Sequence, residues 1–326
     1  MQALIYDGQK VQAVNHLDEP QPAKGEVVIQ SHRMGVCATD LEICRGYMGF
    51  TGVLGHEFVG IVEQANGSKE SRQWVGKRVV GSINCVCGLC DLCRTGLGEH
   101  CRDRTVLGIV GRDGCFAERF VLPANNLIEV PDSIDDDHAV FTEPLAAALQ
   151  IVRQLTIEGR PYITVLGDGR LGLLCTQVLA QQNATVRCVG KHLSKLALCE
   201  KWGVKHRRLE DVGMRADQDI VVDCTGSPDG LVTAMNMVRP RGKIILKTTV
   251  AVGPLGNRGI DLSPLVVNEI ELMGSRCGPF PEALMALDTG SVDVLSLISR
   301  RVKLADGVEA LQSASSPDVI KILLEP

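Results

Sequence analysis

Four cysteines with regular spacing lie in one short stretch of the 326-residue chain. Cys87, Cys90, Cys93 and Cys101 can close a tetrahedral shell of thiolates around one zinc ion, which leaves no coordination position for a substrate. A closed shell of this kind is structural. Cys85 is a fifth cysteine in the stretch and is left out of the set, because Cys87 completes the regular spacing. The alternative interpretation is a chance cluster of free thiols.

Metal-binding residue types that lie farther apart in the chain form a second candidate set. Cys37 lies in the segment GVCATD, His56 and Glu57 in GHEF, and Glu143 in TEPLAAALQ. One thiolate, one imidazole and one or two carboxylates could hold a catalytic zinc ion with an open position for water or an alcohol oxygen. A lone histidine is more often a core or surface residue, and Glu143 could simply begin a helix.

A glycine-rich turn follows the apolar segment YITVLG. Gly167, Gly169 and Gly172 give the pattern G-x-G-x-x-G, and Arg170 and Leu171 open the helix that follows. The first glycine permits a tight turn, the second lets a pyrophosphate approach the backbone, and the third lets helix and strand pack closely. The free N–H groups at the start of the helix favour a phosphate. The pattern predicts a dinucleotide-binding site, although such a turn also occurs without a ligand.

The residues at the end of the second predicted strand indicate which dinucleotide binds. A carboxylate at this position binds the ribose 2′-hydroxyl of NAD, but the residue is Gly190, followed by Lys191 and His192. A glycine removes the charge that would repel a 2′-phosphate, and the two basic side chains could bind it. The sequence therefore favours NADP over NAD; the alternative is a solvated turn that tolerates NAD less well. Thr225, near the end of the third predicted strand, is a further expected cofactor contact.

The chain changes its pattern near residue 140. Residues 1–137 contain short valine and isoleucine runs broken by glycine, proline and charged turns, which is typical of an all-β or barrel-like unit. Beyond it, apolar strand patterns alternate with helical patterns. Alternation of this length predicts a parallel sheet covered on both faces. The predicted strands are residues 162–167, 185–190, 219–226, 243–250 and 270–277.

Composition and charge exclude several classes of protein. A chain of 326 residues exceeds what one hydrophobic core usually serves, so two domains are expected. The net charge of −5 argues against nucleic-acid binding, which needs a basic face. We see no secretory signal and no apolar run of about 18 residues, so we expect a cytoplasmic protein that does not enter a membrane. In a reducing compartment, clustered cysteines are metal ligands more often than disulfides.

Together these segments resemble the zinc-dependent medium-chain dehydrogenase/reductase family, the alcohol dehydrogenase superfamily. The resemblance covers essentially the whole chain, and the polyol, threonine and glucose dehydrogenase branches are most similar. Those branches carry a glutamate where typical alcohol dehydrogenases have a second zinc-ligating cysteine. The resemblance rests on the order of residues 37–40, residues 55–57, the zinc lobe at 85–101, Glu143 with Pro144, and residues 167–172.

The resemblance implies an α/β fold with two domains. Residues 1–137 and 275–326 would form a GroES-like β-barrel catalytic domain that contains the zinc lobe. Residues 138–274 would form a Rossmann domain with a doubly wound parallel sheet, and the active site would lie in the cleft between the domains.

The resemblance also implies roles for individual residues. Cys37, His56 and Glu143 would ligate the catalytic zinc, with Glu57 as an alternative or exchanging ligand. Asp40 matches a carboxylate that orients the zinc-bound histidine. The hydroxyl of Thr39 would pass on the substrate proton.

The implied protein is an NAD(P)-dependent zinc alcohol dehydrogenase with two zinc ions per chain, one catalytic and one structural. It would transfer a hydride between its cofactor and a small-molecule alcohol: a polyol, a sugar, an amino-alcohol or a secondary alcohol. The family further implies a homodimer or homotetramer.

Two other functions stay open. A zinc-ribbon interaction module would use the four-cysteine lobe alone, but these ligands form one compact loop at residues 87–101, unlike the separated C-x-x-C knuckles of ribbons. A zinc-independent quinone or enoyl reductase would keep the fold without the metal chemistry, although such enzymes generally lack the ligands found here.

Overall fold

A computed structural model describes residues 1–249 and 260–326. The chain divides into two compact units, Met1–Glu143 with Phe280–Pro326, and Pro144–Pro279. Helix α5 (Thr142–Gln154) begins in the first unit and continues into the second. Within the described ranges, none of the helices combines the length and the hydropathy that a bilayer span requires.

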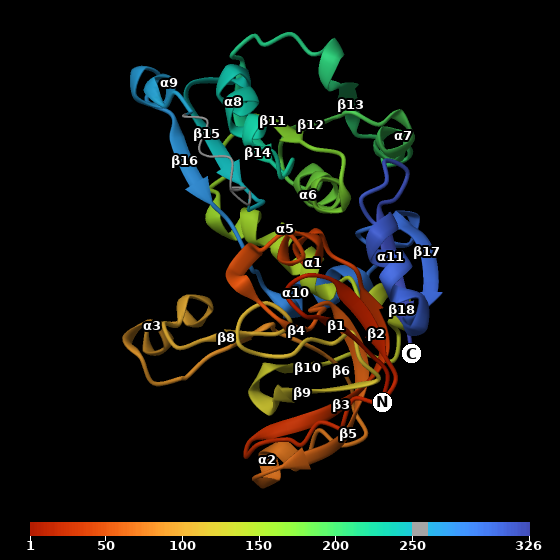
Figure 1. The fold of residues 1–326 in the computed structure, drawn as a ribbon. Helices are drawn as coiled ribbons and strands as arrows, with labels where there is room; N and C mark the ends of the chain where they lie inside the picture. The colour runs from red at the N-terminus through yellow and green to blue at the C-terminus, as the bar shows by residue number, and fades with distance from the viewer. Residues whose placement is uncertain (250–259) are drawn as a thin grey trace. The chain divides into compact units, whose positions relative to one another are not determined.

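The first unit consists mainly of strands joined by short helices (Figure 1). Its strands are β1 (Ala3–Tyr6), β2 (Val11–Val14), β3 (Glu26–Gly35), β4 (Gly52–Val53), β5 (Phe58–Asn66), β6 (Arg78–Gly81), β7 (Asn84–Cys85), β8 (Thr105–Val106), β9 (Arg119–Pro123), β10 (Leu127–Glu129), β17 (Ile298–Lys303) and β18 (Lys321–Glu325). Its helices are α1 (Ala38–Ile43), α2 (Lys69–Arg72), α3 (Asp91–Arg94), α4 (Asp136–Ala139), α10 (Phe280–Asp288) and α11 (Gly307–Ser313).

Strand pairing in the first unit joins the two ends of the chain. One sheet has the order β10-β6-β5-β3-β18-β17, and β9 also pairs with β3; another has the order β2-β1-β4. Strand β18 runs antiparallel to β3, with Leu323 opposite Gly35 and Leu324 opposite Met34. All four residues are buried. This pairing places the first residue of β18, Lys321, beside the end of β3.

The second unit alternates strands and helices. Its elements are β11 (Tyr162–Leu166), α6 (Arg170–Ala180), β12 (Thr185–Gly190), α7 (Leu193–Lys201), β13 (Lys205–Arg208), β14 (Gln218–Asp223), α8 (Pro228–Met237), β15 (Val238–Leu246), α9 (Ser263–Val267) and β16 (Glu271–Gly274). The sheet has the order β13-β12-β11-β14-β15-β16, and every neighbouring pair is parallel. This is the 3-2-1-4-5-6 order of the Rossmann fold, so the predicted parallel sheet is confirmed.

Local sequence explains where the helices of the second unit begin and what they cover. The hydroxyl of Ser227 accepts a hydrogen bond from the N–H of Asp229, and Pro228 occupies the first turn, where its missing N–H costs nothing. Helix α8 then packs its buried Ala234 and Met237 on β14 and β15. Helices α6 and α7 pack beside β12 (Figure 1).

One strand of the sheet has no apolar pattern. Strand β13 has the sequence KHRR, and its side chains are exposed or half-buried at the edge of the sheet. Edge strands often carry charged residues, which oppose pairing with other chains, and this strand was therefore not predicted. The five predicted strands of this unit are all present. The strand at residues 185–190 has the predicted ends, the other four have shifted ends, and Val250 lies outside the described residues.

Candidate active site

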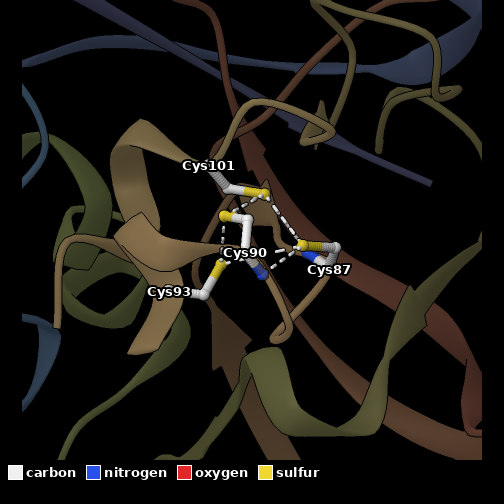
Figure 2. A group of neighbouring side chains, drawn as sticks. All are labelled: Cys87, Cys90, Cys93 and Cys101. Carbon is white, nitrogen blue, oxygen red and sulfur yellow. Dashed lines mark hydrogen bonds between the residues drawn. The ribbon is translucent and has the colours of Figure 1, made fainter. Parts of the chain in front are cut away.

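The four cysteines of the zinc lobe converge on one point (Figure 2). Their ligand atoms all lie within 4.8 Å of one another, and the closest sulfur pairs are 3.5 to 4.0 Å apart. A tetrahedral zinc ion with Zn–S bonds of about 2.3 Å would hold its sulfurs about 3.8 Å apart. A disulfide would need about 2.05 Å, so the arrangement fits a metal and not a pair of bridges.

Backbone groups of the lobe support thiolates. Cys90 is the N-cap residue of the short helix α3, and the N–H groups of Leu89 and Cys90 each lie 3.4 Å from the sulfur of Cys87. These hydrogen bonds lower the pKa of the Cys87 thiol. A hydrogen bond from the backbone N–H of Cys93 lowers the pKa of Cys90 to about 6. The loop therefore stabilises deprotonated sulfur, the form that binds zinc, at Cys87 and Cys90. At Cys93, burial raises the pKa to about 12.

Cys37, His56 and Glu57 form a second cluster, in the first unit. Cys37 is the N-cap residue of α1, two residues after the end of β3, while His56 and Glu57 precede β5. One ligand atom from each lies within 4.8 Å of the others. His56 and Glu57 are buried and Cys37 is half-buried. In the part of the chain that the structure describes, this group does not include Glu143, which is half-buried in the first turn of α5.

Asp40 connects two members of this cluster. Its Oδ2 accepts a hydrogen bond of 2.8 Å from the N–H of Cys37, and its Oδ1 lies 3.3 Å from Nδ1 of His56. Burial by itself lowers the pKa of His56, but the charges of Asp40 and Cys37 outweigh this effect and hold that pKa well above its usual range. Because Nδ1 faces Asp40, Nε2 is the ring nitrogen left for a metal, and the site has the excess negative charge that a cation would balance.

The carboxylate of Glu57 divides its oxygens between two environments. Oε2 accepts a hydrogen bond from Nζ of Lys321, and both side chains are fully buried. Oε1 is buried and has no hydrogen-bond partner among the described residues. A buried carboxylate oxygen without a partner is costly, and a metal ion bound by Cys37 and His56 would supply one.

Lys321 is a residue of this site that the sequence did not reveal. Its Nζ also donates to the backbone oxygen of Val36 at 3.2 Å and lies 5.7 Å from the ring centroid of Phe141. Burial lowers the pKa of Lys321 to about 8. A Cβ atom on Gly35 would overlap both charged groups, so the glycine leaves room for the ion pair. The available signal was a single lysine inside the apolar segment VIKILLEP.

Thr39, two residues after Cys37, places its hydroxyl close to the sulfur of Cys37. Oγ1 of Thr39 lies 3.6 Å from Sγ of Cys37, and both residues are half-buried. The hydroxyl is therefore next to the cluster, on a residue that is partly exposed to solvent.

The glycine-rich turn has the geometry of a phosphate cradle. Gly167 has φ of 117°, and a Cβ atom there would lie 2.8 Å from the backbone oxygen of Cys224. A Cβ atom on Gly172 would overlap the backbone oxygen of Gly167. The N-cap residue of α6 is Gly169, which has no side chain to cap the helix, and a helix N-terminus favours a phosphate.

The remaining expected cofactor residues lie at the same edge of the sheet. Thr225 follows β14, and its N–H would be 3.2 Å from a Cβ atom on Gly167. Gly190 ends β12, and Lys191 and His192 follow it. The carboxyl ends of these parallel strands meet at one edge, which is where open α/β sheets bind ligands. Arg170 and Leu171 are half-buried in the first turn of α6.

Two family models match the chain. The model described as an alcohol dehydrogenase GroES-like domain matches residues 23–132, and the model described as a zinc-binding dehydrogenase matches residues 171–289. The chain belongs to the zinc-dependent medium-chain alcohol dehydrogenase family. The predicted fold of a GroES-like catalytic domain with a Rossmann domain is confirmed, and so is the prediction of an NAD(P)-dependent alcohol dehydrogenase.

Several dehydrogenases align with this protein along almost the whole chain. An L-threonine 3-dehydrogenase from Chelativorans sp. (strain BNC1) is 28% identical, over 94% of this chain and 93% of its own. A sorbitol dehydrogenase from Halalkalibacterium halodurans is 27% identical, over 96% and 95%. A zinc-binding dehydrogenase from Sinorhizobium meliloti 1021, solved with bound NADP, has a TM-score of 0.86 and 27% identity, over 100% of this chain and 99% of that chain.

Proposed function

We propose that this alcohol dehydrogenase uses a catalytic zinc ion held by Cys37 and His56, with Glu57 or Glu143 as a further ligand, and a structural zinc ion held by Cys87, Cys90, Cys93 and Cys101. The observation that carries the proposal is the convergence of Cys37, His56 and Glu57 from two loops onto one buried point. Three protein ligands leave a coordination position for a substrate oxygen, whereas four thiolates do not.

When bound, the two groups would supply the chemistry that side chains lack: zinc would lower the pKa of an alcohol, and the nicotinamide would accept the hydride. The chain supplies position and proton transfer. Asp40 fixes the ring of His56 and the backbone of Cys37 at the same time. Thr39 places a hydroxyl beside the sulfur of Cys37, where it can pass the substrate proton on: its oxygen takes that proton while its own O–H proton leaves to water.

A secondary alcohol with neighbouring polar groups is the proposed substrate class. Relatives aligned over almost the whole chain are named for threonine and sorbitol, an amino-alcohol and a polyol. Both molecules carry a secondary hydroxyl group. In the proposed reaction, oxidation of the secondary hydroxyl group gives a ketone, and the oxidised cofactor is reduced.

NADP is the proposed cofactor of choice. Gly190 presents no carboxylate to a 2′-phosphate, and the side chain of Lys191 is exposed next to it. His192 is half-buried at the same turn. The NADP found in the Sinorhizobium meliloti relative is consistent with this choice.

A homodimer or homotetramer in the cytoplasm stays part of the proposal. The exposed apolar side chains of Val266 and Val267 on α9 are available for contacts between copies. Light scattering of the purified protein distinguishes a monomer from either assembly.

A substrate panel tests the proposed function. Purified protein is given polyols, amino-alcohols and simple secondary alcohols with NADP+ or NAD+, before and after removal of zinc with a chelator. We expect reduction of NADP+ by at least one secondary alcohol, loss of this activity without zinc and its return when zinc is added. Turnover that survives complete removal of zinc would support a zinc-independent reductase instead.

A further inference from the structure

Asp168 lies between the first two glycines of the phosphate cradle, but its carboxylate reaches the end of the neighbouring strand. Oδ2 accepts hydrogen bonds from the N–H groups of Lys191, at 2.8 Å, and His192, at 2.6 Å. Nδ1 of His192 lies 3.1 Å from both carboxylate oxygens. Asp168 is buried, so its negative charge is surrounded by donors of the protein.

The side chain of Asp168 occupies the space above Gly190. A Cβ atom on Gly190 would overlap Cβ, Cγ and Oδ2 of Asp168. Strand β12 therefore cannot end in a residue with a side chain while Asp168 keeps this position. The end of the second strand must therefore be a glycine, Gly190, because the carboxylate of Asp168 from the phosphate loop fills the space that a side chain would need.

The direction of this carboxylate matters for the cofactor. The acidic residue of NAD-binding Rossmann domains accepts hydrogen bonds from the ribose. The carboxylate of Asp168 instead faces the protein backbone, and its bonds hold the turn that carries Lys191 and His192. With the turn fixed, the side chain of Lys191 is exposed to solvent. The ring of His192 is held through its Nδ1 atom, which faces the carboxylate of Asp168. Two basic side chains on a fixed turn suit a 2′-phosphate.

We propose that Asp168 and Gly190 act as one coupled specificity pair, in which the carboxylate of Asp168 fixes the turn of Lys191 and His192 as a 2′-phosphate site. The proposal deepens the NADP preference stated above and rests on it. Asp168 is a positioning residue that acts through the turn. Positions 168 and 190 cannot both carry a carboxylate without overlap. A carboxylate at position 168 favours NADP, and one at position 190 favours NAD.

Titration of the zinc-loaded protein with NADPH and NADH, without substrate, tests the pair. In Asp168→Ala we expect the Kd for NADPH to rise at least about tenfold, and more than the Kd for NADH. In Gly190→Asp alone, both Kd values should rise, because the new side chain overlaps Asp168 and two carboxylates repel each other. In the double variant Asp168→Ala/Gly190→Asp, NADH binding should return and become tighter than NADPH binding.

Asp219→Ala is the matched control. Asp219 also accepts hydrogen bonds from a backbone N–H, of Tyr162 at 2.7 Å, and from a basic side chain, of Arg239 at 2.6 Å. It lies near the amino ends of the same parallel strands, so the control should leave the ratio of the two Kd values unchanged. Thermal unfolding of each variant shows that it is folded, and Asp168→Asn offers a milder change if Asp168→Ala is not.

The results separate the two proposals. If Gly190→Asp alone favours NADH as strongly as the double variant does, positions 168 and 190 act independently and the pair is overturned. Unchanged Kd values in Asp168→Ala and Asp168→Asn overturn it as well. A wild type that prefers NADH contradicts the proposed NADP preference, whereas the coupling of the pair is still decided by whether the two substitutions are additive.

Discussion

Lys321 and Glu57 form a fully buried ion pair, although 264 residues separate them in the chain. The pairing of β18 with β3 brings the lysine to the metal cluster from the end of the chain. It balances the charge of the glutamate while leaving Oε1 of the same carboxylate for a metal. The site thus has a cation of its own beside the position proposed for zinc.

Removal of Lys321 should strongly destabilise the fold of the zinc-free protein. Lys321→Met leaves Glu57 as an unpaired buried charge, which typically costs about 3–5 kcal/mol in the free energy of unfolding. Zinc should reduce the loss, because the metal provides a second counter-charge for Glu57. Urea unfolding with a chelator and with zinc measures both values.

Lys303→Met is the control for this prediction. Lys303 lies on the adjacent strand β17 and pairs with Glu325 at 3.1 Å, but its side chain is 64% exposed. An exposed pair contributes about 0–1 kcal/mol. Equal losses in the free energy of unfolding of Lys321→Met and Lys303→Met would show that the buried pair does not stabilise the cluster.

The four-cysteine lobe should hold a zinc ion that stabilises the fold. We expect Cys90→Ser to lose one zinc ion per chain and about 5–10 °C in Tm, because the loop folds around its metal. Elemental measurement and thermal unfolding provide the two readouts. Cys277→Ser, at a half-buried cysteine of the second unit, should change neither. A Cys90→Ser protein with full zinc content would contradict the assignment of this ligand.

The hydroxyl of Thr39 should affect turnover and not zinc binding. We expect Thr39→Val to lower kcat by about 10²-fold, the usual contribution of a positioned proton-transfer group. Zinc content and the Kd for NADPH should stay at wild-type values. Thr39→Ser, which keeps the hydroxyl, should recover most of the rate. If Thr39→Val turns over as fast as Thr39→Ser, the proton leaves by another route.

Asp219 should contribute stability that disappears in acid. Burial raises its pKa, but hydrogen bonds from Arg239 and from the N–H of Tyr162 outweigh this effect and hold the pKa below its usual range. A group of this kind stabilises the fold above its unfolded pKa of about 3.9, and the contribution is lost as the pH falls through the lower folded value. Asp219→Asn should therefore cost about 1 kcal/mol in the free energy of unfolding at pH 7 and less than that at pH 2. An equal loss of stability at both pH values would contradict the predicted pH dependence.

Sequence patterns predicted the parts of the fold that rest on local periodicity. The strands at Tyr162–Leu166 and Thr185–Gly190 are mostly apolar; the first is followed by a glycine and the second ends in one, so both were expected. Strand β13 was missed because an edge strand needs no apolar face, and KHRR has none. The spacing of Cys87, Cys90, Cys93 and Cys101 was sufficient to expect one cluster, because all four lie in a short loop.

Contacts between distant residues could not be predicted in this way. Lys321 meets Glu57 only through the pairing of two strands, and no pattern near either residue specifies the partner. Gly190 was noted at a strand end, and Asp168 lies inside the glycine motif, but the overlap of the two depends on the direction of the Asp168 side chain. Zinc ligation by Cys37, His56, Glu57 or Glu143 stays a prediction that metal measurements must test.

Zinc content and turnover, measured on the same preparations of wild type and Cys37→Ser, test the central claim most directly. We predict two zinc ions per chain in the wild type and one in the variant. The turnover of the variant should fall by about 10³-fold or more, while its Kd for NADPH stays unchanged. A Cys37→Ser protein that has lost one zinc ion and still oxidises its alcohol at the wild-type rate would contradict the account.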